Sequence, residues 1–359
     1  MEFSKRDMKM LQGIAILFML SLHLFARKDI DGLYETFPMI NDIPLVYYIG
    51  LFGDACVPIH LFVSGYGLTI SLAKGNVLNK NIKRILKLLI NFWIILFMFM
   101  GIGFLIGKME AFPGGISQFL LNFSLLSNSY NGAWWYLQTY VLLVLMAAPL
   151  IKLVKRNNSI IVLMVSGFIY LITYIQRIKF VIEFDSTILT MLNNAIVLLG
   201  TSQLAFIIGI IFAKEQIYSK LYNTINDIKF KNTLCVLGVI ILVIFHGIFE
   251  TMFVAPFTAI LFICIFCLMD KKEFVQKGFA FFGRHSLNIW LTHMFFYISF
   301  FKVAVFAPYY PILIFSWLVL LCLVTSFVIN IINDPLARII DKHFVQLSLN
   351  HSFRKRKVS

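Results

Sequence analysis

The amino-acid sequence predicts an all-α integral membrane protein of about ten transmembrane helices, with both termini in the cytoplasm. Of its 359 residues, 60% are apolar and only 13% are charged, and the mean hydropathy is +0.86. A soluble domain is nearer half apolar and a quarter charged, so this chain would expose too much apolar surface to water. Apolar runs of about twenty residues recur along the whole chain, and each is long enough to cross the hydrocarbon core of a bilayer.

Ten segments have the length and composition of membrane-spanning helices. They are residues 9–26, 46–73, 85–107, 132–153, 159–176, 188–213, 233–250, 252–269, 285–306 and 311–332. The first segment follows basic residues but lacks a signal-peptide cleavage pattern, so it is interpreted as a retained helix. We assign residues 1–335 to one polytopic membrane domain and residues 336–359 to a basic cytoplasmic tail.

The distribution of Lys and Arg predicts the orientation, because cytoplasmic loops retain positive charge. With the N-terminus inside, the predicted cytoplasmic segments hold 25 of the 31 Lys and Arg residues, and every inner segment exceeds its outer neighbours. Orientation and attraction to anionic lipid therefore explain the net charge of +14 without nucleic-acid binding. The sequence predicts a multi-pass protein of the cell (plasma) membrane, with lipids as its surroundings.

A polar stripe follows one face of the first predicted helix. Gln12 and His23 are eleven residues apart, which is about 20° beyond three full helical turns. Lys9 lies within about 40° of the same line. This stripe suits a substrate that enters from the cytoplasm and reacts deeper in the membrane. The alternative interpretation is a snorkelling Lys and a Gln that packs between helices.

Other ionisable groups lie inside predicted spans, where such groups are costly and tend to mark functional paths. Asp54 and His60 lie in the second helix on either side of Pro58, and a proline there favours a kink and a cavity. His293 lies in the ninth helix, and His246 lies near the outer end of the seventh. A single membrane histidine is as often a hydrogen-bonded packing residue, but several together indicate function.

Five segments carry short motifs in a characteristic order. They are 11–16 running on to His23, 58–66, 83–87, 134–137 with Pro149-Leu150, and 283–293. Together they resemble the membrane acyltransferase 3 family, whose members transfer acyl groups, usually acetyl from acetyl-CoA, to sugars of surface polysaccharides. Ten helices is the usual size of that family. One departure is that the family's first-helix Arg falls on Gln12 here, with Lys9 one turn nearer the cytoplasm.

The resemblance implies roles for the residues that match, and acyl transfer needs a base or a nucleophile that imidazole supplies. His23 is the predicted catalytic residue. For the phosphates of acetyl-CoA, the predicted binding residues are Lys9, Gln12, Lys83, Arg84, Lys87 and Arg284. The predicted substrate or cavity residues are Asp54, His60, Ser64, Tyr66, Trp134, Trp135 and His293. The basic residues equally suit topology signals, and the tryptophans suit an interfacial aromatic belt.

The sequence therefore predicts an O-acyltransferase that moves an acyl group, taken to be acetyl, from cytoplasmic acyl-CoA to a saccharide of a cell-surface or exopolysaccharide. Acetyl-CoA is the expected donor, and no metal is expected, because Cys264 and Cys267 have no second ligand pair. The alternative is a multi-span transporter or exporter of a polar solute. Transporters usually show two comparable halves, and residues 1–155 and 156–332 are not similar.

Overall fold

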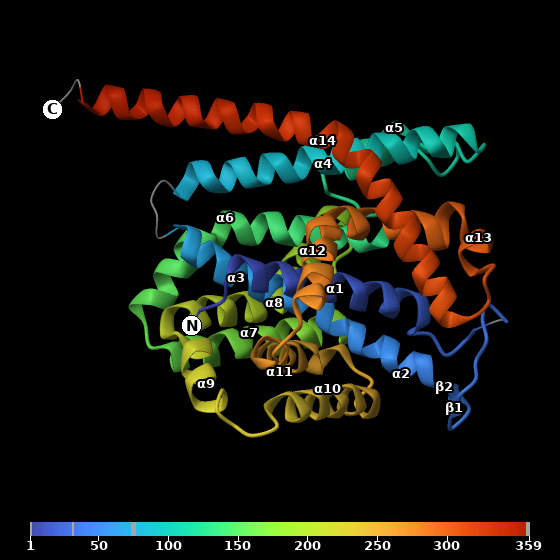
Figure 1. Cartoon of the computed structure of the whole chain (residues 1–359). Coiled ribbons are helices and arrows are strands. Elements are labelled where there is room, and N and C mark those ends of the chain that lie inside the picture. The colour runs from blue at the N-terminus through green and yellow to red at the C-terminus, as the bar shows by residue number, and fades with distance from the viewer. Residues whose placement is uncertain (1, 31, 73–76, 357–359) are drawn as a thin grey trace.

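A computed structural model describes residues 2–30, 32–72 and 77–356 of the chain, and it is almost entirely helical (Figure 1). A two-stranded antiparallel ribbon pairs β1 (Met39–Ile40) with β2 (Ile43–Pro44). In chain order the helical elements are α1 (Lys5–Phe25), α2 (Leu45–Leu51), η1 (Phe52–Ala55), α3 (Cys56–Leu72), α4 (Val77–Leu105), α5 (Ile116–Phe123), η2 (Gly132–Trp134), α6 (Trp135–Arg156), α7 (Ser159–Lys179), α8 (Thr187–Glu215), α9 (Ile217–Ile225), α10 (Lys231–Ile248), η3 (Met252–Val254), α11 (Ala255–Leu268), α12 (Glu273–Met294), η4 (Phe295–Phe300), α13 (Lys302–Phe306) and α14 (Pro311–Arg356).

Each of the ten predicted segments coincides with one or more of these helices. Among the described residues, eight helices are long and apolar enough to cross a membrane, and the predicted eighth segment is a shorter apolar helix at Met252–Leu268. The predicted ninth segment, 285–306, covers the end of α12 together with η4 and α13, and α12 begins at Glu273 rather than at residue 285. The structure thus confirms an almost entirely helical chain with several helices long and apolar enough to span a membrane, while the count of ten stays a prediction.

The last helix differs from the prediction, because α14 is 46 residues long and continues through the segment assigned to the basic tail. Figure 1 shows that α14 bends part-way along its length. Pro335 lies inside the helix, where it removes one backbone hydrogen bond and accounts for a bend. Two short helices, α5 and α9, were not predicted, because eight or nine residues cannot produce a long apolar run.

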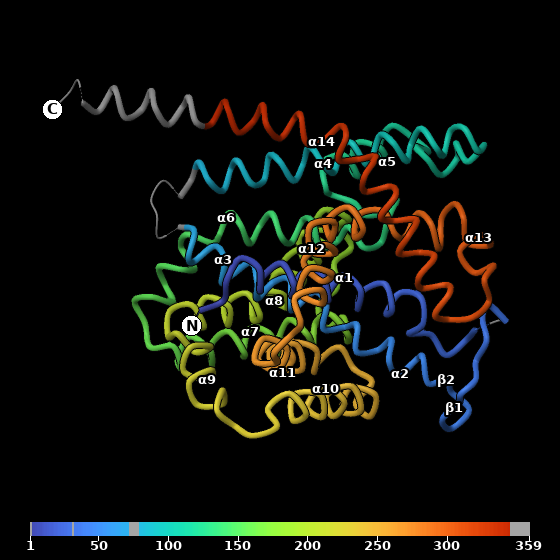
Figure 2. Tube along the Cα trace, viewed as in Figure 1, coloured from blue at the N-terminus to red at the C-terminus, as the bar shows by residue number. Residues whose placement is uncertain are grey.

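Helix α1 crosses the middle of the bundle and lies against α12, as the Cα trace shows (Figure 2). It begins at Lys5 because Ser4 caps it, with the Ser4 hydroxyl accepting from the Asp7 N–H and the Asp7 carboxylate accepting from the Ser4 N–H. Glycines permit its close contact with α12. A Cβ added at Gly13 would lie 1.9 Å from the Phe279 carbonyl oxygen. The backbones of the two helices therefore touch, as small residues allow in membrane helix pairs.

A tight turn at Glu250-Thr251 joins α10 to η3 and is tied to the start of the second predicted span. The Glu250 carboxylate accepts a hydrogen bond of 2.8 Å from the Tyr47 hydroxyl and forms an ion pair of 2.6 Å with Lys28. The hydrogen bond from Lys28 holds the pKa of the Glu250 carboxyl below its usual value. These contacts fix α2 beside the α10–α11 turn.

The ends of the helices agree with alternating passage through a bilayer. In Figure 1 the start of α1, the α6–α7 turn and α9 lie towards the left, while β1, β2 and α13 lie towards the right. We predict that reporter domains fused after Asn157 or Asp227 report the cytoplasm. Fusions after Gly115 or Lys179 are expected to report the outside, because the positive-inside count supports all of these assignments together. One reversed reporter would refute the ten-span topology.

Candidate active site

A cavity of about 720 Å³ runs through the bundle between α1, α3, α4, α6, α7, α8, α12 and α14. Its size lies within the range of small-molecule and cofactor sites, about 300–1,000 Å³. At the end predicted to face the cytoplasm its polar lining residues are Lys9, Arg84, Lys87, Arg284, Asn333 and Asp334. At the opposite end they are His23, Asp54, Tyr170, Tyr174 and Arg177.

Helix α1 supplies one wall of this cavity along a single face. Lys9, Gln12, Ile16, Met19 and His23 all line it, at spacings of three and four residues. That spacing is the spacing of one helical face. The Lys9 ammonium donates a hydrogen bond of 3.3 Å to the Gly283 carbonyl oxygen, so this side chain also fastens α1 to α12. The polar stripe predicted from the sequence is therefore part of the cavity wall.

His23 lies half-buried in the cavity wall, and its ring packs against the ring of His293 with 4.9 Å between centroids. His293 is fully buried, and it is not among the residues that line the cavity. Its Nδ1 lies 2.7 Å from the Trp290 carbonyl oxygen. A carbonyl oxygen only accepts, so Nδ1 carries the proton and Nε2 of the neutral ring is left as an acceptor. His293 thus supports the His23 ring from behind the wall.

The second predicted span is interrupted where Asp54 lies. Helix α2 gives way to the 3₁₀ turn η1 over Phe52–Ala55 before α3 begins. Pro58 explains this break, because a proline cannot donate to the carbonyl four residues earlier and its ring clashes with it. The Asp54 carboxylate faces the cavity, and its Oδ2 lies 3.4 Å from Nε2 of the fully buried His246. The pair joins α10 to the site.

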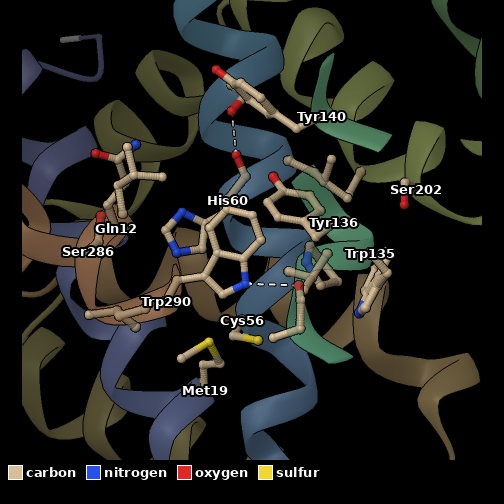
Figure 3. A pocket seen from close by; sticks show the side chains of 18 of the residues that line it. Gln12, Met19, Cys56, His60, Trp135, Tyr136, Tyr140, Ser202, Ser286 and Trp290 are labelled. Carbon is tan, nitrogen blue, oxygen red and sulfur yellow. Dashed lines mark hydrogen bonds between the residues drawn. The ribbon is translucent and has the colours of Figure 1, made fainter. Parts of the chain in front are cut away.

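His60 and Ser64 line the middle of the cavity from α3. The Ser64 hydroxyl donates a hydrogen bond of 2.8 Å to the carbonyl oxygen of His60, one turn earlier. Figure 3 shows His60 near the centre of the view, with Gln12 towards one side and Trp135 towards the other. Tyr66, which was predicted to line the cavity, does not. It is buried elsewhere and its hydroxyl donates to Glu2 at 2.5 Å.

The basic residues predicted for the donor fall into two groups. Arg84, Lys87 and Arg284 line the cavity, whereas Lys83 does not. Lys83 and Lys87 both form ion pairs with Asp341 of α14, at 2.7 and 2.6 Å. Nη1 of Arg84 is buried without a hydrogen-bond partner among the described residues. Of the three residues on α4 that were predicted to bind the donor, Arg84 therefore has the most capacity left for an anion.

The two tryptophans that open the fourth predicted span have separate positions. Trp134 is buried, and its indole N–H donates a hydrogen bond of 3.0 Å to the Leu291 carbonyl oxygen, so it fastens η2, just before α6, to α12. Trp135 lines the cavity, and the guanidinium of Arg177 lies over its ring at 5.4 Å. This distance is that of a cation–π contact. Only Trp135 is thus available to a molecule in the cavity.

Several lining residues were not predicted. Asn91, Asn288 and Asn330 form a chain of side-chain hydrogen bonds of 2.7 and 2.9 Å that joins α4, α12 and α14 beside the cavity. Asn288 lies within the matched segment 283–293, so its motif was the available signal. Arg177 was counted as a charge of an outer loop. Nothing in its local sequence indicates that α7 turns it towards the cavity.

Comparison with known proteins identifies the family. A family model described as an acyltransferase domain matches residues 6–331, which is most of the chain. No curated protein and no solved structure matches. The match runs from α1 to the first part of α14, and so covers most of the helices that line the cavity. The chain therefore belongs to the membrane acyltransferase 3 family.

Proposed function

We propose that this protein is a membrane O-acyltransferase that moves an acetyl group from acetyl-CoA in the cytoplasm to a hydroxyl of a surface-polysaccharide sugar. The observation that carries the proposal is the single cavity with basic side chains at one end and His23 with Asp54 at the other. A molecule bound among the basic residues can extend a flexible arm towards His23. The donor and the acceptor then meet inside the bundle, from opposite faces of the membrane.

The basic end of the cavity suits the phosphates of acetyl-CoA. Arginine binds phosphate with two parallel N–H groups, and it stays charged in a partly buried site. Arg84 has a free buried Nη1, and Arg284 lines the same end from α12. Gln12, at the position of the family's Arg, offers a neutral amide to the donor. Lys9 provides the charge on that face of α1.

At the other end, His23 acts as the general base. Its unprotonated ring nitrogen takes the proton from the sugar hydroxyl while that oxygen attacks the thioester carbonyl carbon. The tetrahedral intermediate collapses with cleavage of the C–S bond, and the histidine returns the proton to the leaving sulfur as CoA departs. The products are the acetyl ester and free CoA, so atoms and charge balance. General base catalysis of this kind contributes about a hundred- to ten-thousandfold in rate.

The direct test incubates the purified protein with radiolabelled acetyl-CoA and with surface polysaccharide, taken from the cells that make this protein and then de-O-acetylated. The expected result is radiolabel in the polysaccharide that mild alkali removes, because mild alkali cleaves esters. Mass spectrometry of the glycan from wild-type and deletion cells identifies the modified sugar. Uptake or export of a labelled solute without any acyl transfer would instead favour the transporter alternative.

The basic end of the cavity allows a quantitative prediction about donor binding. Arg84→Gln should raise the KM for acetyl-CoA by about tenfold or more, because a charge-assisted hydrogen bond is worth about 1.5–3 kcal/mol. Lys83→Gln is the matched control, since Lys83 does not line the cavity and is paired with Asp341. Steady-state kinetics with both variants at equal membrane abundance measure the difference. Equal KM values for the two variants would reduce Arg84 to a topology signal.

A further inference from the structure

A second cavity of about 570 Å³ lies beside the first one, at the end predicted to face outward. It is enclosed by the segment after α5, the start of α6, the end of α7 and the start of α8. Two residues, Trp135 and Arg177, line both cavities. They contact each other through the cation–π contact of 5.4 Å. The two spaces therefore share one wall, made of an indole and a guanidinium.

The polar lining of the second cavity consists mainly of carboxamides. Its polar lining residues are Ser127, Asn128, Gln138, Gln176, Arg177, Asn193 and Asn194. Among the residues that the structure describes, no Asp, Glu or Lys lines it, and Arg177 is the single charge in the lining. A carboxamide both donates and accepts hydrogen bonds, as a sugar hydroxyl does. This lining fits a neutral polyhydroxylated ligand better than a cation or a polyphosphate.

Three of these carboxamides are available to a ligand. Gln176 is engaged, because its amide bonds the N–H and the carbonyl of Ile182 and closes the turn after α7. Gln138, Asn193 and Asn194 have no side-chain hydrogen bond or ion pair with any residue that the structure describes. Gln138 stands one turn after Trp135 on α6, and the two asparagines stand on α8. Free amides therefore lie on opposite sides of the space.

We propose that the second cavity is an acceptor subsite, which holds neutral sugar units adjacent to the one that is acylated. This inference rests on the proposed function. The sugar chain lies between Gln138 and Asn193, passes the indole of Trp135, and places its reacting unit in the first cavity. The enzyme then prefers a chain of several sugars to a single sugar, since a single sugar leaves these amides without a partner.

The experiment measures binding and transfer separately. De-O-acetylated polysaccharide from the producing cells is hydrolysed and fractionated into single sugars and fragments of four or more units. Calorimetry with the full chain in nanodiscs gives the Kd of each fraction without donor, and labelled acetyl-CoA gives the KM. Gln138→Ala/Asn193→Ala is the test variant. Asn223→Ala is the matched control, because Asn223 is exposed on α9 and lines neither cavity.

The wild-type protein should bind the fragments at least tenfold more tightly than single sugars. In the test variant this ratio should fall by about tenfold or more, because each lost hydrogen bond costs about two- to tenfold in affinity. The control variant should keep the wild-type ratio. An unchanged ratio in the test variant, or no fragment binding by wild type, overturns the subsite even where transfer occurs. A third outcome is that the test variant loses the preference for fragments while neither the wild type nor any variant transfers acetyl. That outcome supports the subsite and refutes the proposed acyltransferase activity instead.

Discussion

His23→Ala is expected to abolish acyl transfer while the protein still inserts at normal abundance. His23 lies in the cavity wall, on the face of α1 that also carries Gln12 and Lys9. Loss of a general base lowers the rate by about a hundred- to ten-thousandfold, a decrease large enough to be measured in the transfer assay. The His23 side chain is only half-buried, so its removal costs little packing energy. Transfer of label from acetyl-CoA to polysaccharide, normalised to protein in the membrane, measures the effect.

The control for this variant must be a histidine far from the cavity. His246 does not serve, because it is fully buried and its Nε2 lies 3.4 Å from Asp54 in the cavity wall. Its place near the outer end of the seventh predicted helix, outside the matched segments, predicts a smaller effect for His246→Ala than for His23→Ala. His343→Ala is the better control, since its side chain is exposed on α14. Transfer at the wild-type rate by His23→Ala would remove the catalytic role from His23 and favour His60, which also lines the cavity, over the buried His293.

Gly283→Val is expected to reduce both stability and activity severely. A Cβ at Gly283 would lie 1.9 Å from the Lys9 carbonyl oxygen, and one at Gly13 would lie 1.9 Å from the Phe279 carbonyl oxygen. Neither contact is relieved by a side-chain movement, because both involve backbone, so α1 and α12 must separate. Overpacking a well-packed core typically costs about 1–3 kcal/mol, and a backbone clash belongs at the upper end or above. His23 on α1 then shifts relative to Trp290 on α12.

Thermal unfolding of the purified protein in detergent measures this effect. Gly278→Ala on the same helix is the matched control, because a Cβ there meets nothing within 4 Å. Alanine is also favoured over glycine in a helix by about 1 kcal/mol, so the control should be neutral or slightly stabilised. Equal melting temperatures for Gly283→Val and wild type would show that the two helices do not touch at this point.

Most of the long helices could be predicted from the sequence, because a run of apolar residues long enough to cross a bilayer depends only on local composition. The face shared by Lys9, Gln12 and His23 was predictable for the same reason, since it follows from the helical repeat alone. The start of α12 was not predictable in this way, because the predicted ninth segment begins at residue 285 and α12 begins at Glu273. Its first half carries polar residues such as Gln276 and Lys277, which conceal a helix from a search for apolar runs.

The pairing of residues across the fold was not predictable. Asp54 meets His246, and Lys83 meets Asp341, at sequence separations that only helix packing brings together. Asp341 lies in the segment that was taken for a solvated tail, so nothing indicated that it neutralises Lys83. Tyr66 belongs to a matched motif, yet its hydroxyl bonds Glu2 rather than facing the cavity. A motif fixes a position along a helix, but neighbouring helices decide which space the side chain enters.

The length of the first cavity has an electrical consequence. It extends from Arg84 and Arg284 at one end to Arg177 at the other, so a bound molecule occupies part of the distance across which the membrane potential falls. A charge that crosses the whole potential changes its energy by about 2.3 kcal/mol for each 100 mV. With the orientation predicted from Lys and Arg, and a negative cell interior, the field drives the phosphates of the proposed donor, acetyl-CoA, from the cytoplasmic end of the cavity towards its outer end. Under the proposed function, the resting voltage of the cell would then add to the binding energy of the donor in the cavity.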